Sequence, residues 1–179
     1  FAKKQKADMI VISNHYRKPF KRMIMGSKVE AIVNHSEIGV LSFDFPVLEI
    51  EEGISTLELF HGPTMAFKDV GARFMARCLG YFNKDNNEEV TVLVATSGDT
   101  GGAVASGFLG VKGVRVVILY PSGKVSHVQE KQLTTLGQNI TALEVDGTFD
   151  DCQDIVKRAF LDDDLTEKMA LTSANSINI

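Results

Sequence analysis

The chain from Val90 onward alternates short apolar segments with amphipathic ones, and this alternation restricts the fold more than any other feature. "VTVLVAT", residues 90–96, is a β-branched run typical of a strand that is covered on both faces. The segments that follow are alternately helical and strand-like in pattern: 100–110, 114–120, 126–137, 140–147 and 148–160. This order predicts a three-layer α/β fold, in which helices cover both faces of a parallel sheet.

Two of these helices begin with the signature of a capping box. Ser126 precedes Gln129, and Thr148 precedes Asp151, at the spacing that lets each pair satisfy free N–H groups of a first helical turn. The last helix is amphipathic, and we expect one set of its side chains to face inward: Cys152, Ile155, Val156, Ala159 and Phe160.

The first part of the chain is patterned differently. "FPVLEIEEGISTLELF" predicts two strands around a turn at Glu52-Gly53, and residues 29–38 have helical spacing. We expect residues 1–42 to form a mostly helical N-terminal segment and residues 43–179 to form the α/β region. The closing residues, "LTSANSINI", end on an unfinished apolar pattern, so we expect an N-terminal fragment of a longer protein.

Charge and composition exclude several classes of partner. A net charge of −4 gives no reason to expect nucleic acid or an anionic membrane. No apolar run approaches the roughly 20 residues that span a bilayer. Cys78 and Cys152 fall in predicted helices and are expected to be reduced, as in a cytoplasmic protein. The histidines lack the spacing of a metal site.

"HGPTMAFKDVGARF", residues 61–74, predicts a helix with Thr64 as its N-cap. Helical spacing places Asp69, Arg73 and Arg77 on a solvent-facing stripe. The expected apolar row is Phe67, Val70, Phe74, Cys78 and Tyr81.

Lys68 does not belong to the solvent stripe of this helix. It falls between Met75 and Leu79 in the apolar arc, and in the first turn, where the helix dipole disfavours a cation. Such a lysine is expected to have a lowered pKa, which suits a nucleophilic amine. A lysine that packs its stem and extends its ammonium group to water explains the same position, and the helix pattern alone favours that interpretation.

"ATSGDTGGAVASG", residues 95–107, leaves the first parallel strand and enters a helix, where open α/β sheets bind ligands. Its backbone N–H groups are expected to bind a phosphate or carboxylate. The spacing of Gly98, Gly101 and Gly102 differs from the dinucleotide fingerprint, and the Gly-Lys-Ser/Thr of a P-loop is absent. Glycines that only permit close packing of helix and strand are the alternative.

An isolated lysine and an anion-binding loop with the hydroxyls of Ser97 and Thr100 suit one kind of chemistry. An aldehyde cofactor held as an imine on Lys68 would act on a substrate whose carboxylate binds at the loop. Pyridoxal phosphate is the obvious aldehyde, because its ring stores the electrons of a carbanion.

Several motifs in order resemble the threonine synthase family: "ELFHGPTMAFKD", "ATSGDTGGAVA", "ILYPSGKVSHVQEKQLTTLG", "DGTFDDCQDIVK" and "NSIN". The resemblance runs from about Phe43 to the end. It implies a tryptophan-synthase-β-like fold (type II) and a pyridoxal-phosphate-dependent lyase. The implied reaction converts O-phospho-L-homoserine and water to L-threonine and phosphate.

The resemblance also implies roles for individual residues. Lys68 matches the catalytic lysine that binds the cofactor, and His61 and Phe67 flank it, with packing as acceptable a role for them as substrate contact. The remaining matches are cofactor-binding Asp99, Asn175 and Asn178, and substrate-binding Ser97, Gly98, Thr100 and Gly101.

Residues 1–36 do not follow the family's N-terminal pattern, and the family's glycine-rich loop for the cofactor phosphate follows "NSIN". Two alternatives remain open: a related phospholyase that releases phosphate and 2-oxobutanoate, and a non-catalytic binding protein with the same fold. The setting of Lys68 disfavours a serine or threonine dehydratase. Monomer and dimer are both compatible with the sequence.

Overall fold

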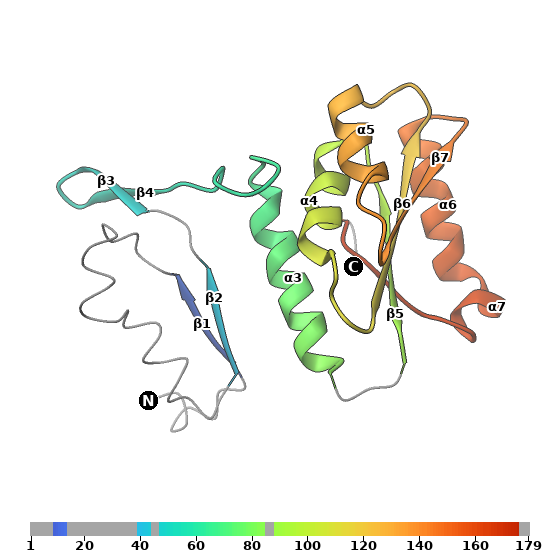
Figure 1. The fold of residues 1–179 in the computed structure, drawn as a ribbon, viewed down its shortest axis with the longest axis horizontal. Coiled ribbons are helices and arrows are strands. Elements are labelled where there is room, and N and C mark those ends of the chain that lie inside the picture. Colours follow the sequence, from blue (N-terminus) through green and yellow to red (C-terminus); the bar gives the residue numbers. More distant parts are fainter. Residues whose placement is uncertain (1–8, 14–38, 44–46, 85–87, 176–179) are drawn as a thin grey trace. The chain divides into compact units, whose positions relative to one another are not determined.

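The structure, a computed structural model, describes residues 9–13, 39–43, 47–84 and 88–175. The chain divides into two compact units, Phe1–His61 and Gly62–Ile179. Each unit is described by itself, with the element labels of Figure 1.

The first unit contains two pairs of strands (Figure 1). β1 (Met9–Ser13) and β2 (Gly39–Phe43) are parallel, whereas β3 (Val47–Glu51) and β4 (Ile54–Leu57) form an antiparallel hairpin. Gly53 turns the hairpin with φ of 79°, which confirms the predicted turn. Within residues 1–42, the described segments are strands rather than helices, and the expected helix at 29–38 lies outside the described residues.

The second unit is built on a four-stranded parallel sheet in the order β7-β6-β5-β8. Its strands are β5 (Val90–Ala95), β6 (Val114–Pro121), β7 (Ile140–Val145) and β8 (Ala170–Ser173). Its helices are α3 (Lys68–Phe82), α4 (Asp99–Phe108), α5 (His127–Thr134), α6 (Phe149–Leu161) and α7 (Asp163–Thr166). The predicted alternation of strands and helices after Val90 is thereby confirmed, and β8 adds a strand at the end.

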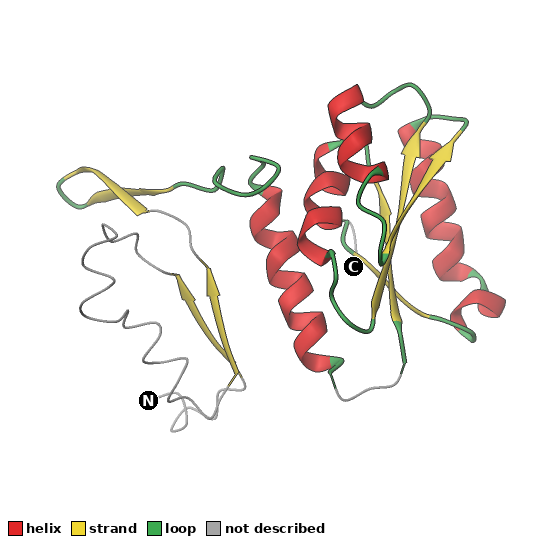
Figure 2. Cartoon of the chain, viewed as in Figure 1, coloured by secondary structure: helices red, strands yellow, loops and turns green. Residues whose placement is uncertain are grey.

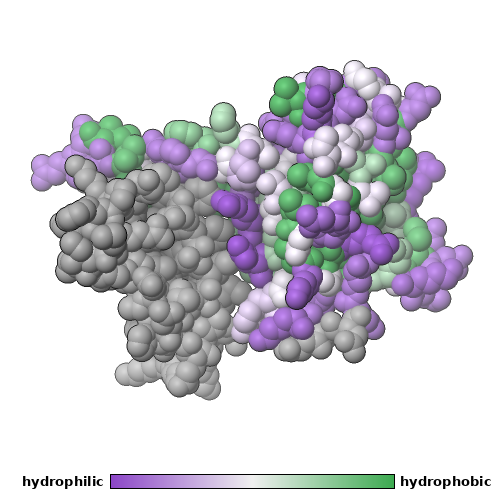
Figure 3. Space-filling view, in the orientation of Figure 1, coloured by the Kyte–Doolittle hydropathy of each residue, from purple (hydrophilic) through white to green (hydrophobic). Residues whose placement is uncertain are grey.

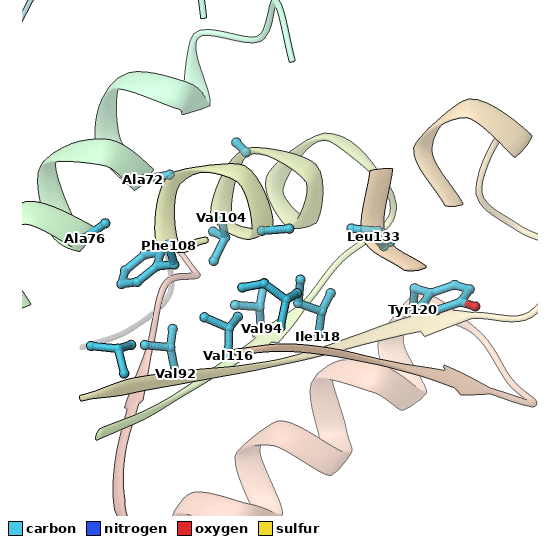
Figure 4. Packing of buried hydrophobic residues seen from close by; sticks show 14 residues of the cluster. Ala72, Ala76, Val92, Val94, Val104, Phe108, Val116, Ile118, Tyr120 and Leu133 are labelled. Atoms are coloured by element: carbon cyan, nitrogen blue, oxygen red, sulfur yellow. The ribbon is translucent and has the colours of Figure 1, made fainter. Parts of the chain in front are cut away.

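Helices cover both faces of this sheet, as Figure 2 shows. One face packs against α4, where Val104 and Phe108 meet Val92, Val94, Val116 and Ile118 (Figure 4). On the other face, Cys152 and Val156 of α6 pack against Ala95 and Leu119. Alternate residues of β5 and β6 therefore enter different cores, which is why these two central strands are mostly apolar. The prediction of a three-layer α/β fold is confirmed.

α3 packs on α4 through small residues, so its expected apolar row is wrong. The buried residues of α3 are Asp69, Ala72 and Ala76, and a Cβ added at Gly107 of α4 would lie 3.2 Å from the Ala72 carbonyl carbon. Helices this close leave no space for phenyl rings. Met75 and Leu79 are half-buried against the core, whereas the aromatic side chains at this helix are exposed: Phe67, Phe74, Tyr81 and Phe82.

Two further expectations for individual residues need correction. Asp69 is fully buried, so only Arg73 and Arg77 of the expected solvent stripe are exposed. On α6, Cys152 and Val156 are buried as predicted, but Ile155 is 45 % exposed because it lies beyond the edge of the face that meets the sheet.

Hydrophobic and hydrophilic side chains are mixed on the surface of the described residues. In Figure 3, hydrophobic residues gather near the middle of the second unit, and hydrophilic residues surround them. None of the helices in the described ranges has the length and apolar character that crossing a membrane requires.

Both predicted capping boxes are confirmed, and the one on α6 makes stability depend on pH. Thr148 donates its N–H (2.6 Å) and its hydroxyl (2.8 Å) to the Asp151 carboxylate. These bonds hold the pKa of Asp151 below its usual value of 3.8. The stability that Asp151 contributes is therefore complete above that value and is lost as pH falls through the lowered pKa.

We expect Asp151→Ala to unfold at lower urea concentration than the parent chain at neutral pH, with the difference shrinking in acid. Asp150→Ala, at an exposed neighbour in the same helical turn, is the control and should lack most of this pH dependence. A difference for Asp151→Ala that stays constant into strong acid would contradict the assignment.

Candidate functional site

The turn before Lys68 is closed by Asp69 rather than by a helix cap at Thr64. The helix begins at Lys68, later than predicted, and its N-cap residue, Phe67, makes no side-chain capping bond. Thr64 donates its N–H to Asp69 Oδ2 (3.0 Å) and its hydroxyl to Asp69 Oδ1 (2.8 Å). Thr64 is therefore bound, but it acts across the turn instead of capping the helix.

Asp69 is suited to this role by its position and its burial. It lies in the first turn of α3, where the helix dipole favours a negative charge, and its exposure is 0 %. Gly62 passes so close that a Cβ there would overlap the Asp69 carboxylate, and Met65 takes a positive φ of 58°. The turn thus has one tightly packed conformation, and Lys68 is attached at its end.

The turn that carries Lys68 lies against α4. A Cβ added at Gly102 would be 3.6 Å from Thr64 Cγ2, so the two segments are in contact at this point. Lys68 itself is half-buried, and no carboxylate of the described residues lies within ion-pair distance of its amine. The structure therefore brings the lysine turn and the N-terminal turn of α4 together, with no salt bridge between the amine and the described part of the chain.

Thr96 shapes the glycine-rich loop, and the sequence analysis missed it. Its buried hydroxyl accepts the N–H of Gly98 (3.0 Å) and of Gly101 (2.8 Å), which bends the chain from β5 into α4. A threonine directly before Ser-Gly at a strand end is the signal that could have found it, because hydroxyls of this kind bond to the backbone of tight turns.

Gly98 and Gly101 are required by packing. Gly98 has φ of 144°, and a Cβ there would overlap the Gln129 side-chain amide. A Cβ on Gly101 would lie 2.5 Å from Thr96 Cγ2 and 2.9 Å from Leu133 Cδ2. Both glycines are therefore required by close packing, against Gln129 for Gly98 and against Thr96 and Leu133 for Gly101.

The same loop also presents hydrogen-bond donors at the N-terminus of α4. Among the described residues, none accepts from the backbone N–H groups of Ser97, Asp99 or Thr100. Ser97 and Asp99 are exposed, and Thr100 is half-buried. Free N–H groups at a helix N-terminus bind carboxylates and phosphates, so packing and anion binding are compatible here.

Asn175 supports the end of β5. Its Oδ1 accepts the N–H of Ala95 (3.0 Å), and its Nδ2 donates to the Ala95 carbonyl (2.7 Å). Both ends of the amide are occupied just before the loop begins, so Asn175 holds the strand from which the loop departs. Contact of Asn175 with a cofactor stays a prediction, and Asn178 lies outside the described residues.

His61 and Phe67, which flank the lysine motif, are both exposed, and the choice between packing and substrate contact stays a prediction for them. His61 bonds through Nε2 to Glu58 Oε2 (2.5 Å) and stacks on Phe60 at 4.5 Å between ring centroids. Phe67 is 65 % exposed.

Neither cysteine offers a nucleophile to this site. Both are free thiols, and Cys152 is buried on the opposite face of the sheet from α4. Burial raises the pKa of the Cys78 thiol and of the Cys152 thiol, which keeps both protonated.

A hollow of about 490 Å³ lies away from the lysine turn. Arg73, Arg77 and Lys112 are among its lining residues, whereas Lys68 and residues 96–101 are not. The chemistry of the lysine turn and the loop therefore marks the site better than the size of this hollow does.

A family profile described as "Pyridoxal-phosphate dependent enzyme" matches residues 54–177. The chain belongs to this family. The match confirms the cofactor that the sequence predicts, pyridoxal phosphate. A second profile, described as "Universal stress protein family", matches residues 1–43.

Relatives and solved structures support the resemblance stated from the motifs. Threonine synthase of Buchnera aphidicola subsp. Baizongia pistaciae is 53% identical over 153 residues, covering 82% of this chain and 36% of the relative. Threonine synthase of Escherichia coli is 55% identical over 138 residues, covering 77% of this chain and 32% of the relative. The chain thus spans about a third of the length of the curated relatives it matches.

Crystal structures of threonine synthases match this fold. That of Escherichia coli threonine synthase superposes with a TM-score of 0.65 at 55% identity, over 76% of this chain and 31% of that one. The structure of threonine synthase from Brucella melitensis with bound pyridoxal phosphate superposes with a TM-score of 0.67 at 43% identity. The match covers 75% of this chain and 29% of that one. The predicted fold class, the type II fold of pyridoxal-phosphate enzymes, is confirmed.

We expect Asp69→Asn to lower the free energy of unfolding by about 1–3 kcal/mol, because an amide N–H₂ then faces a buried donor on Thr64. Urea denaturation measures the change. Arg77→Ala, at an exposed position of the same helix, is the control and should stay within about 0.5 kcal/mol. Equal stability of Asp69→Asn and the parent chain would rule out this role for Asp69.

Proposed function

We propose that the protein containing this chain is a threonine synthase, which converts O-phospho-L-homoserine and water to L-threonine and phosphate. The contact between the lysine turn and the N-terminus of α4 is the observation that carries the proposal. Within the described residues, it joins an amine that has no ion-pair partner to backbone N–H groups that have no acceptor. Identities above 50% with threonine synthases, over 82% and 77% of this chain, support it.

The residues present fit one end of the cofactor. When bound, pyridoxal phosphate supplies an aldehyde that an amine can attack and a ring that withdraws electrons from the substrate α-carbon. Lys68 is half-buried and has no paired carboxylate among the described residues, so its amine is available to hold the aldehyde carbon. Once the substrate amine takes its place, Lys68 removes the proton on the substrate α-carbon.

The loop at α4 orients the substrate. The N–H groups of Ser97, Asp99 and Thr100 donate to the substrate carboxylate, with the hydroxyls of Ser97 and Thr100 beside them. Glycine at positions 98 and 101 lets the loop take up the conformation that binds substrate, because a side chain at either position would overlap its neighbours. The Asp99 side chain and Asn178 would hold the cofactor, and Asn175 would act on the same site through its bonds to Ala95.

Loss of the γ-phosphate and addition of water at the β-carbon complete the reaction. The related phospholyase differs only in whether water is held at the β-carbon. Retention of Lys68, Ser97, Asp99 and Thr100 together favours an enzyme over a binding protein with the same fold.

We assign the protein to the cytoplasm, since both cysteines are free. We also propose a boundary between residues 42 and 43, which the two family matches support.

We expect Lys68→Ala in the full-length protein to lose the visible absorption band of the bound cofactor and about 10³-fold or more in kcat/KM. Borohydride reduction of the parent protein, followed by peptide mass spectrometry, should locate the cofactor on Lys68. Lys112→Ala, at an exposed lysine of the same unit, is the control and should keep both signals. Near-parental turnover by Lys68→Ala would refute the assignment.

Product analysis separates the two catalytic alternatives. With O-phospho-L-homoserine as substrate, we expect equal amounts of phosphate and L-threonine, because addition of water follows loss of phosphate. Amino-acid chromatography and a phosphate assay on the same sample measure the ratio. Release of 2-oxobutanoate in place of threonine would identify a phospholyase, and binding of the cofactor without turnover would identify a binding protein.

A further inference from the structure

Gln129 connects α5 to the loop that begins α4. Its side-chain amide donates through Nε2 to Asp99 Oδ1 at 2.8 Å. At the other end of the amide, Oε1 accepts the Ser126 hydroxyl at 2.8 Å and the Ser126 N–H at 3.2 Å. The orientation of the amide is therefore determined from both sides, with its oxygen toward two donors and its nitrogen toward a carboxylate.

The same amide also lies against the backbone of Gly98. Gly98 is buried with φ of 144°, and a Cβ there would overlap the Gln129 amide atoms. Gln129 thus contacts two consecutive residues at the start of α4: the glycine whose conformation other residues avoid, and the carboxylate that follows it. A substitution of Gln129 would remove contacts that hold Gly98 and the Asp99 carboxylate in place.

We propose that Gln129 is a positioning residue that holds the Gly98–Asp99 segment in the geometry that binds substrate and cofactor. The inference rests on the proposed function. One Asp99 oxygen is held by Gln129, and no described residue donates to the other, which leaves it for a bound ligand. The contacts of Gln129 also fix the position of the Asp99 N–H, which lies at the N-terminus of α4.

The helix cap alone does not require glutamine at this position. A capping box needs only an acceptor at its third residue, and glutamate supplies one equally well. The box on α6 has a carboxylate there, Asp151. An amide nitrogen is needed only for the bond to Asp99, since a carboxylate at residue 129 would repel Asp99 at that distance. This difference separates a capping role from a positioning role.

The test compares Gln129→Glu, Gln129→Met and Thr148→Ala in the full-length protein with bound cofactor. Glutamate keeps the cap, methionine keeps the shape without hydrogen bonds, and Thr148→Ala removes a cap elsewhere. We expect kcat/KM with O-phospho-L-homoserine to fall about 10²-fold in both Gln129 variants, mainly through KM, as for misplaced binding groups. Gln129→Glu should lose kcat/KM out of proportion to any change in Tm, and Thr148→Ala should lower Tm with kcat/KM unchanged.

Parental kcat/KM in Gln129→Glu, or losses that follow Tm across all three variants, would overturn the inference, because capping would then be the only role of Gln129. Retained activity in Gln129→Met alone would assign the effect to charge and would also overturn it. Amide hydrogen exchange of residues 97–101 gives a readout independent of turnover: faster exchange in both Gln129 variants supports positioning. Absence of threonine formation by the parent protein would count against the proposed function, with the exchange result still deciding the role of Gln129.

Discussion

The close approach of α4 to its neighbours is the constraint on which the rest of the second unit depends. Gly101 meets Thr96 and Leu133, and Gly107 meets the backbone at Ala72, with no room for a side chain at either glycine. Because α4 packs on the sheet with one face and on α3 with another, two segments distant in sequence become neighbours. The lysine turn meets α4 at Gly102 only as a consequence of this packing.

Polar side chains then hold the backbone at the site. Thr96 binds the loop from inside, Asn175 binds the end of β5, and Asp69 closes the turn before Lys68. Each of these bonds occupies a backbone group that would otherwise be unsatisfied in a buried position. In the part of the chain that the structure describes, nothing accepts from the N–H groups of Ser97, Asp99 and Thr100 at the start of α4, and for that reason the ligand is expected there.

Much of the fold after Val90 could be predicted because hydrophobic spacing and capping signals are local. Both capping boxes, the hairpin turn at Gly53 and the strand-helix alternation were confirmed. The burial of α3 was predicted wrongly for the opposite reason. Its face was chosen by counting large apolar residues, whereas contact with a glycine-bearing helix selects small ones, and the partner surface of α3 is not visible in its own spacing.

The sequence by itself determined which chemistry is available: a lysine at a helix start, a glycine-rich turn after a buried strand, and motifs in the order found in threonine synthases. The tertiary structure alone decided that Asn175 binds the backbone of Ala95 and that Gln129 reaches Asp99 from another helix. The physical reason is distance along the chain. Spacing within one element reports its own caps and faces, but a hydrogen bond between elements exists only once packing has brought them together.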